Sequence, residues 1–302
     1  MESFQSKLVK ILLRIFKLNN MWKLTGDELK NSIEKRQSSE SHEPPKRIQN
    51  KFNITKNEIN GHCYYVMKPF KNIGQKHILF LHGGGYVYEI SSLYWEFLSK
   101  LIDALGCTIT VPIYPLAPKH AYQEVFDMIV PIYQQIISEV ELQDVVIMGD
   151  SAGGGMSLAL AQLLKEKDLA QPGNIILISP ALDMSFSNPE IHEVEKLDPI
   201  LAVPSLSYIT KWYGGGIGSK NYLVSPIYGD VEGLGKISLF IGTNDIFYPD
   251  AKKFRKITQQ KGIKINYYVY PSMMHIWPLF FFPESKKATG QIIKIIKSSN
   301  SI

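Results

Sequence analysis

The sequence predicts an α/β fold in which a mainly parallel central sheet is flanked by helices. From about residue 77 onward, short apolar runs of strand length alternate with amphipathic stretches of helix length, which is typical of such sheets. Two of the apolar runs end in glycine-rich turns, at residues 82–85 and 149–155. The 302 residues, 45% of them hydrophobic and 20% charged, are enough to bury a large core in one globular body.

The first 47 residues differ from the rest in composition. Residues 1–22 place apolar side chains on one predicted helical face among basic ones: Leu8, Ile11, Leu12, Ile15 and Phe16, with Lys7, Lys10, Arg14 and Lys17. Residues 25–47 are polar and end in Glu43-Pro44-Pro45, which predicts a linker or an irregular lid segment.

The remainder of the chain begins with two β-like runs, near 48–56 and 62–68, which predict an antiparallel start to the sheet. Further strands are expected near 77–82, 107–113, 144–149, 174–179, 236–242 and 264–270. Helices are expected near 91–105, 121–138, 152–166, 250–261 and 284–298. Residues 183–225 break this alternation with Trp212, Tyr213 and three glycines, and we interpret them as an insertion that contributes to a lid.

Charge and cysteine content argue against several classes of protein. The formal net charge is +5, and residues 1–47 account for most of it, with ten Lys or Arg against six Asp or Glu. A nucleic-acid-binding domain would spread its basic residues over a folded face, so no nucleic-acid partner is expected. Cys63 and Cys107 fit neither a metal spacing nor a disulfide framework, and no cofactor or metal is expected.

Two interpretations of residues 1–22 remain open. The segment is too short and too charged to span a bilayer, and Arg14 and Lys17 interrupt what would be a signal-peptide core, so a cytoplasmic location is the default. It forms either a cap helix over the active site, which we favour, or a basic amphipathic helix on a membrane surface.

The turn after the apolar run 145–148 carries the clearest chemical signal. Gly149-Asp150-Ser151-Ala152-Gly153 is a Gly-x-Ser-x-Gly sequence, followed at once by a helical stretch. Between a strand and a helix this pattern forms a sharp turn that exposes the serine hydroxyl, and the helix N-terminus favours developing negative charge. Ser151 is therefore the predicted nucleophile.

A second glycine run suits the chemistry of an activated serine. The strand-like residues 78–81 end in His82-Gly83-Gly84-Gly85. Consecutive glycines let backbone N–H groups face a cavity, where they stabilise an oxyanion by about 3–4 kcal/mol per donor. His82 is interpreted as a structural residue of this loop.

A nucleophilic serine needs a base and an acid, which follow it in the order Ser, Asp or Glu, His in this kind of fold. His275 lies in a loop after the last predicted strand, whereas His192 lies in a polar stretch typical of a solvated surface. Asp245 follows the strand-like residues 237–241 and is the favoured acid. Its rival Asp250 suits the N-cap of the following helix better.

With these residues the chain resembles the hormone-sensitive-lipase-like esterases of the α/β-hydrolase superfamily, from about residue 75 to 298. The segment Tyr114-Pro115-Leu116-Ala117-Pro118 matches the family's Tyr-x-Leu-Ala-Pro, although Lys119 stands where the family usually has Glu. The resemblance implies an α/β-hydrolase fold, with residues 48–302 as the catalytic domain. It also implies a cap built from residues 1–47 and from an insertion near 183–225, and oxyanion donors from the N–H groups of Gly84, Gly85 and Ala152.

The predicted function is hydrolysis of short-chain carboxylic esters by the triad Ser151, His275 and Asp245, without a cofactor. An arylformamidase with the same apparatus is the close alternative, and a ligand-binding protein that has lost catalysis is a distant one. The expected partner is a small-molecule ester. Weak membrane contact through residues 1–22 and a homodimer remain open.

Overall fold

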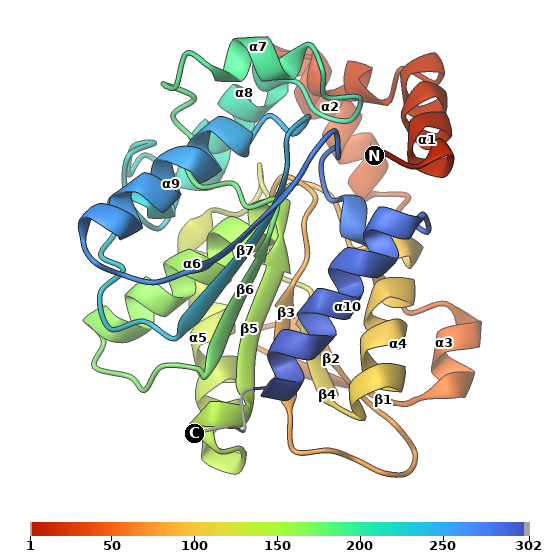
Figure 1. Ribbon diagram of the computed structural model, residues 1–302, viewed down its shortest axis with the longest axis vertical. Helices are drawn as coiled ribbons and strands as arrows, with labels where there is room; N and C mark the ends of the chain where they lie inside the picture. Colours follow the sequence, from red (N-terminus) through yellow and green to blue (C-terminus); the bar gives the residue numbers. More distant parts are fainter. Residues whose placement is uncertain (1, 299–302) are drawn as a thin grey trace.

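The computed structural model describes residues 2–298 and is built on one eight-stranded sheet (Figure 1). The strands follow the spatial order β1-β2-β4-β3-β5-β6-β7-β8. Pairs β1–β2 and β2–β4 are antiparallel, and the other neighbours are parallel. The predicted fold class and the antiparallel start of the sheet are therefore confirmed. The strands are β1 Asn53–Ile59, β2 His62–Lys68, β3 His77–Leu81, β4 Thr108–Pro112, β5 Val145–Asp150, β6 Asn174–Ile178, β7 Lys236–Gly242 and β8 Asn266–Tyr270.

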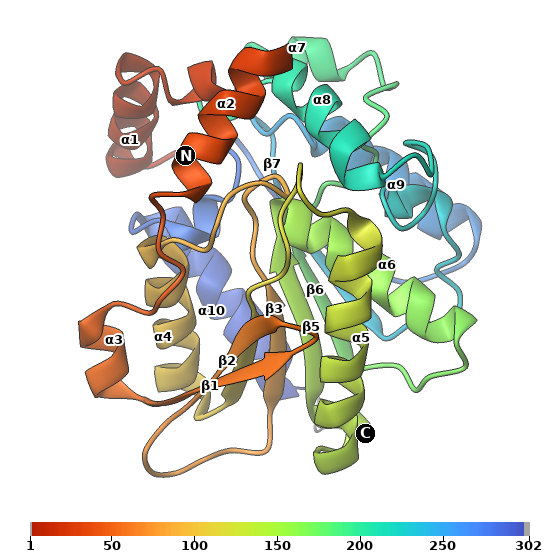
Figure 2. The ribbon, with the colours of Figure 1, turned by 180° about the vertical axis from the view of Figure 1, so that it is seen from behind.

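Helices cover both faces of the sheet (Figures 1 and 2). Helices α4 (Ser92–Leu105) and α10 (Pro283–Ser298) pack on one face, and α5 (Tyr122–Glu139), α6 (Ser151–Glu166) and α9 (Tyr248–Gln260) pack on the other. Side chains alternate along each strand, so Ile78 and Phe80 enter the first core while Leu79 and Leu81 enter the second. Because both faces are covered, the central strands carry apolar side chains on both of their faces.

Residues 25–47 are more ordered than the linker or irregular segment that the sequence predicts. They contain helix α2 (Gly26–Gln37), whose Leu29 and Ile33 are fully buried one turn apart. A second helix, α3 (Lys46–Lys51), occupies the start of the run predicted as strand near 48–56. Each helix is held by only one or two buried apolar side chains, too few to stand out in a polar stretch.

The insertion and the N-terminal segment meet at one end of the molecule, where α1, α2, α7 and α8 lie together (Figures 1 and 2). Helices α7 (Ile191–Glu195) and α8 (Val203–Gly214) belong to the insertion, and the short η1 helix (Leu18–Trp22) follows α1. The Ser205 hydroxyl of α8 donates to the Leu24 carbonyl oxygen at 2.7 Å, tying the two segments together. The remaining short helices are η2 (Leu142–Asp144), η3 (Pro226–Tyr228) and η4 (Trp277–Leu279).

Helix α1 (Phe4–Ile15) is present as predicted but turns its apolar side outward. On its inner side Ser6 and Lys10 are buried, and Val9 and Leu13 pack partly buried against the core. The Lys10 ammonium is satisfied inside by a salt bridge to Glu2 at 2.6 Å and by the Ser272 carbonyl oxygen at 3.0 Å. Within residues 2–298, no helix has both the length and the apolar character needed to cross a membrane.

Candidate active site

Ser151 lies on the sharp turn between β5 and α6, in a left-handed backbone conformation with φ of 52°. Left-handed backbone is strained for a residue with a side chain, and the surrounding packing holds it in place. A Cβ atom at Gly153 would lie 1.9 Å from the Leu81 carbonyl oxygen of β3, so only glycine allows the helix to approach this closely. The glycine of the motif thus sets the geometry of the turn, and the turn presents the Ser151 hydroxyl.

The structure brings Ser151, His275 and Asp245 into one hydrogen-bonded chain. His275 Nε2 lies 2.9 Å from Ser151 Oγ, and its Nδ1 lies 3.0 Å from Asp245 Oδ2. Asp245 follows β7 and accepts a further hydrogen bond at Oδ1 from the Phe247 amide, 3.0 Å away. The three side chains follow the carboxyl ends of the parallel strands β5, β7 and β8, which lie at the same edge of the sheet.

Burial and charge act in opposite directions on His275. The ring is 2% exposed, and this desolvation by itself lowers the pKa of the imidazole. The carboxylate of Asp245, with smaller contributions from Asp198 and Asp150, favours the imidazolium, and the net pKa of His275 is raised above its ordinary value. The arrangement therefore supports a histidine that takes a proton readily from a neighbouring hydroxyl.

Asp198 is a buried residue of the site that the sequence analysis missed. Its Oδ2 accepts from the Ile246 amide at 3.1 Å, next to Asp245, and its Oδ1 accepts from the Ile200 amide at 2.8 Å. Burial, together with the charge of Asp245, raises the pKa of Asp198 to about 7. Asp198 ends the polar stretch 190–198, which also holds the exposed His192. Its one distinguishing signal is the apolar sequence that follows it.

The glycine loop after β3 lies beside the Ser151 side chain, since a Cβ atom at Gly83 would lie 3.1 Å from Ser151 Cβ. Gly84 and Gly85 have φ of 113° and 61°, values that glycine adopts without strain. A Cβ atom at Gly85 would lie 2.7 Å from the Trp22 ring, so the N-terminal segment packs directly on this loop. Ala152 lies in the first turn of α6, where backbone N–H groups have no partner in a preceding turn.

The Asp150 carboxylate, next to Ser151 in the sequence, holds the glycine loop. Oδ1 accepts from the Gly83 amide at 3.0 Å, and Oδ2 accepts from the Tyr94 hydroxyl at 3.1 Å. Full burial raises the pKa of Asp150 to about 7. His82, at the start of the loop, stacks on the Tyr114 ring with centroids 4.3 Å apart, and burial lowers its pKa to about 4. A neutral, buried imidazole fits its interpretation as a structural residue.

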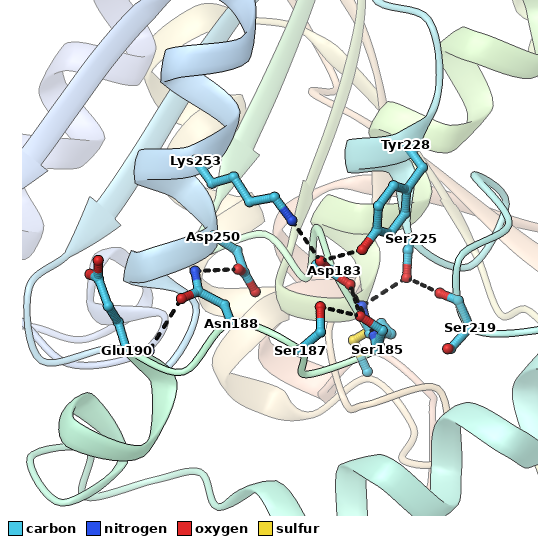
Figure 3. A network of polar contacts seen from close by, with 11 residues as sticks. Asp183, Ser185, Ser187, Asn188, Glu190, Ser219, Ser225, Tyr228, Asp250 and Lys253 are labelled. Carbon is cyan, nitrogen blue, oxygen red and sulfur yellow. Dashed lines mark hydrogen bonds and ion pairs between the residues drawn. The ribbon is translucent and has the colours of Figure 1, made fainter.

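Asp250 does not cap its helix, contrary to the sequence-based expectation. Helix α9 starts at Tyr248 with Phe247 at the N-cap, so Asp250 is the third residue of the helix, within its first turn. Its side chain is buried and accepts from Asn188 Nδ2 at 2.9 Å, beside the network of Asp183 and Lys253 (Figure 3). Desolvation raises the pKa of Asp250 to about 6. Its hydrogen bond therefore goes to the insertion rather than to His275.

Among residues 2–298, no three His, Cys, Asp or Glu side chains are grouped in a way that could hold a metal ion.

The chain resembles known proteins over most of its length. A family model described as the alpha/beta hydrolase fold matches residues 78–279. An esterase of Acinetobacter venetianus is 29% identical over 225 residues, which cover 73% of this chain and 74% of that protein.

Two further proteins extend the comparison. An acetyl-hydrolase of Streptomyces hygroscopicus is 25% identical over 232 residues, which cover 76% of this chain and 77% of the acetyl-hydrolase. A crystal structure from Staphylococcus aureus has a TM-score of 0.86 and 30% identity, covering 93% of this chain and 95% of that chain.

Exchange of the two rival acids distinguishes their roles. We expect Asp245→Asn to lower kcat on a soluble ester by about 10⁴-fold, because an amide stabilises neither the required tautomer nor the imidazolium. Asp250→Asn, the matched control, keeps its hydrogen bond acceptor for Asn188 and is expected to keep kcat within about threefold. Steady-state kinetics on both variants measure this, and a dead Asp250→Asn beside an active Asp245→Asn would reverse the assignment.

The raised pKa of His275 predicts where activity is lost on acidification. Only the neutral imidazole accepts the serine proton, so kcat/KM is expected to fall as the pH drops through the pKa of His275, with a midpoint above 6.5. Asp198→Asn removes a charge that raises this pKa and is expected to move the midpoint to lower pH. Profiles of kcat/KM from pH 5 to 9 test this, and a flat profile or a midpoint below 6.5 would contradict it.

Proposed function

Because the chain belongs to the family of the alpha/beta hydrolase fold, we propose that it is a serine carboxylesterase acting through Ser151, His275 and Asp245. The observation that carries this proposal is the continuous hydrogen-bonded chain from Ser151 Oγ through the His275 ring to Asp245 Oδ2. A hydroxyl, a base and an orienting carboxylate in this order are the apparatus of acyl transfer. The family and the names of the two relatives support the same chemistry.

The proposed reaction proceeds in two halves. Ser151 Oγ attacks the ester carbonyl carbon while His275 Nε2 takes the hydroxyl proton, and the N–H groups of Gly84, Gly85 and Ala152 bind the oxyanion. His275 returns the proton to the leaving alcohol, which leaves an acyl-enzyme. Water, deprotonated by His275, then attacks the acyl carbon. The bond from this carbon to Ser151 Oγ breaks, His275 returns the proton to Oγ, and the carboxylic acid leaves.

The two alternatives are less well supported. An arylformamidase would use the same residues, but the relatives are named as an esterase and an acetyl-hydrolase, which favours esters. A protein that only binds ligands does not need its base aligned with a serine, and here the His275 ring is in hydrogen-bonding distance of Ser151. Ester hydrolysis is therefore the function that the site supports best.

We further propose that residues 1–47 and the insertion near 183–225 form a cap that restricts the acyl group to short chains. Trp22 and Leu206, one from each segment, both lie against Gly85 of the glycine loop, and Ser151 is only 7% exposed. A substrate therefore meets a confined space. As partners we propose a small-molecule ester at Ser151 and, through residues 1–22, a membrane surface.

Replacement of the nucleophile tests the central proposal. Ser151→Ala is expected to reduce ester hydrolysis by about 10⁶-fold while the circular dichroism spectrum stays that of the native protein. An organophosphonate is expected to label the native protein once, at Ser151, as seen by mass spectrometry of its peptides. Stoichiometric labelling of the Ser151→Ala protein would rule out this serine as the nucleophile.

A series of p-nitrophenyl esters tests the confined site. We expect kcat/KM to be highest for acetate or butyrate and to fall by about tenfold or more at eight carbons, because longer acyl chains collide with the cap. Trp22→Ala removes the ring above Gly85 and is expected to shift the optimum to longer chains. A preference for long chains in the native protein would contradict the proposed cap.

A further inference from the structure

The outward side of helix α1 carries an apolar surface that no other part of residues 2–298 covers. Six side chains of α1 and its C-cap, between 42% and 76% exposed, share this side: Phe4, Leu8, Ile11, Leu12, Ile15 and Phe16. Their spacing of three, four and seven residues places them in one stripe along the helix. Scattered apolar side chains on a surface are ordinary, but a contiguous stripe of this kind marks an interaction site.

The opposite side of α1 is held against the rest of the protein by hydrogen bonds, so the apolar stripe faces solvent. Lys10 is buried and donates to the Ser272 carbonyl oxygen, three residues before His275. Arg14 donates to the Leu197 carbonyl oxygen at 3.1 Å. These contacts would be lost if the helix rolled to bury its apolar side, and the buried Lys10 charge would lose its partners.

The charges beside the stripe indicate the chemistry of its partner. Lys7, Arg14, Lys17 and Lys23 are exposed in or next to α1 and η1, whereas Glu2, the one acidic residue among residues 2–22, is paired with Lys10. An apolar face bordered by lysine and arginine is the pattern of a helix that lies in the headgroup layer of a negatively charged membrane. A second copy of this chain would instead bring the same positive charges together.

We propose that the outward side of α1 binds an anionic lipid surface, from which the enzyme takes its ester substrates. The second part of this inference rests on the proposed esterase function. Helix α1 lies at the same end of the molecule as α2, α7 and α8, which surround the catalytic edge of the sheet (Figures 1 and 2). The chain also runs from α1 directly to Trp22, which lies on Gly85, so bound lipid would lie near the catalytic loops.

Sedimentation of the full chain with sucrose-loaded vesicles tests the lipid site. Vesicles of phosphatidylcholine alone are compared with vesicles of phosphatidylcholine and phosphatidylglycerol in equal parts. Both are tested at 50 and 500 mM NaCl. Ile11→Ser/Ile15→Ser removes two side chains of the stripe. The matched control, Phe70→Ser/Ile73→Ser, removes two similarly exposed side chains from the loop between β2 and β3.

We expect the native protein and the control to bind the anionic vesicles, and the α1 variant to bind at least about tenfold more weakly because less apolar surface enters the headgroup layer. High salt is expected to weaken binding of the native protein to the anionic vesicles. The native protein is also expected to bind vesicles of phosphatidylcholine alone at least about tenfold more weakly than the anionic vesicles. Equal binding by the α1 variant and the control, or equal binding to both vesicle types, would overturn the proposal. Dimerisation of the native protein that Ile11→Ser/Ile15→Ser abolishes, without vesicle binding, would assign the stripe to a second copy.

Activity separates this inference from the function on which it rests. All the proteins are assayed on p-nitrophenyl acetate in solution and on an ester dissolved in the anionic vesicles. We expect Ile11→Ser/Ile15→Ser to keep its activity on p-nitrophenyl acetate. Its activity on the ester in the vesicles is expected to fall by about tenfold. If the native protein binds vesicles but hydrolyses neither ester, the esterase proposal fails and the lipid site stands. If hydrolysis of the vesicle-borne ester is unchanged in the variant, delivery from the surface is overturned.

Discussion

The close approach between β3 and α6 constrains the whole site. Helix α6 can begin directly after β5 only if its first turn passes within contact of the Leu81 carbonyl oxygen, and Gly153 is the residue that allows this. At the same turn Ser151 has its left-handed conformation, and the first turn of the helix has backbone N–H groups without a partner inside the helix. This close backbone contact lies next to the proposed nucleophile and next to the strand that leads into the proposed oxyanion donors of the glycine loop.

Buried carboxylates organise the rest of the site around His275. Asp245, Asp198 and Asp150 are all shielded from water, yet they hold different segments: the imidazole, the amide after Asp245, and the glycine loop. Desolvation disfavours the charged forms of Asp198 and Asp150 and raises the pKa of each to about 7. Asp245 is then the carboxylate best placed to stabilise the imidazolium.

The sequence was most informative where a local pattern determines the structure. The alternation of strands and helices, and the turns at residues 82–85 and 149–155, follow from periodicity and from glycine, and the family match confirms the predicted fold class. Contacts between distant segments leave no such pattern. Asp198 holds the Ile246 amide across 48 residues of sequence, and Asp250 binds Asn188 rather than capping its own helix. Both depend on how the insertion folds back onto the segment after β7 and onto helix α9.

The orientation of helix α1 also could not be predicted from its local sequence pattern. Its periodicity predicts two faces, but it does not predict which face turns inward, because that depends on partners elsewhere in the chain. Burying the apolar stripe would contribute roughly 1.5–3 kcal/mol per fully covered large side chain. The fold instead buries Lys10, which is tolerated only because Glu2 and the Ser272 carbonyl oxygen compensate the charge. An orientation that leaves so much apolar surface in water is favourable as a whole when something outside the monomer covers it. The basic side chains beside the stripe favour an anionic lipid surface in that role.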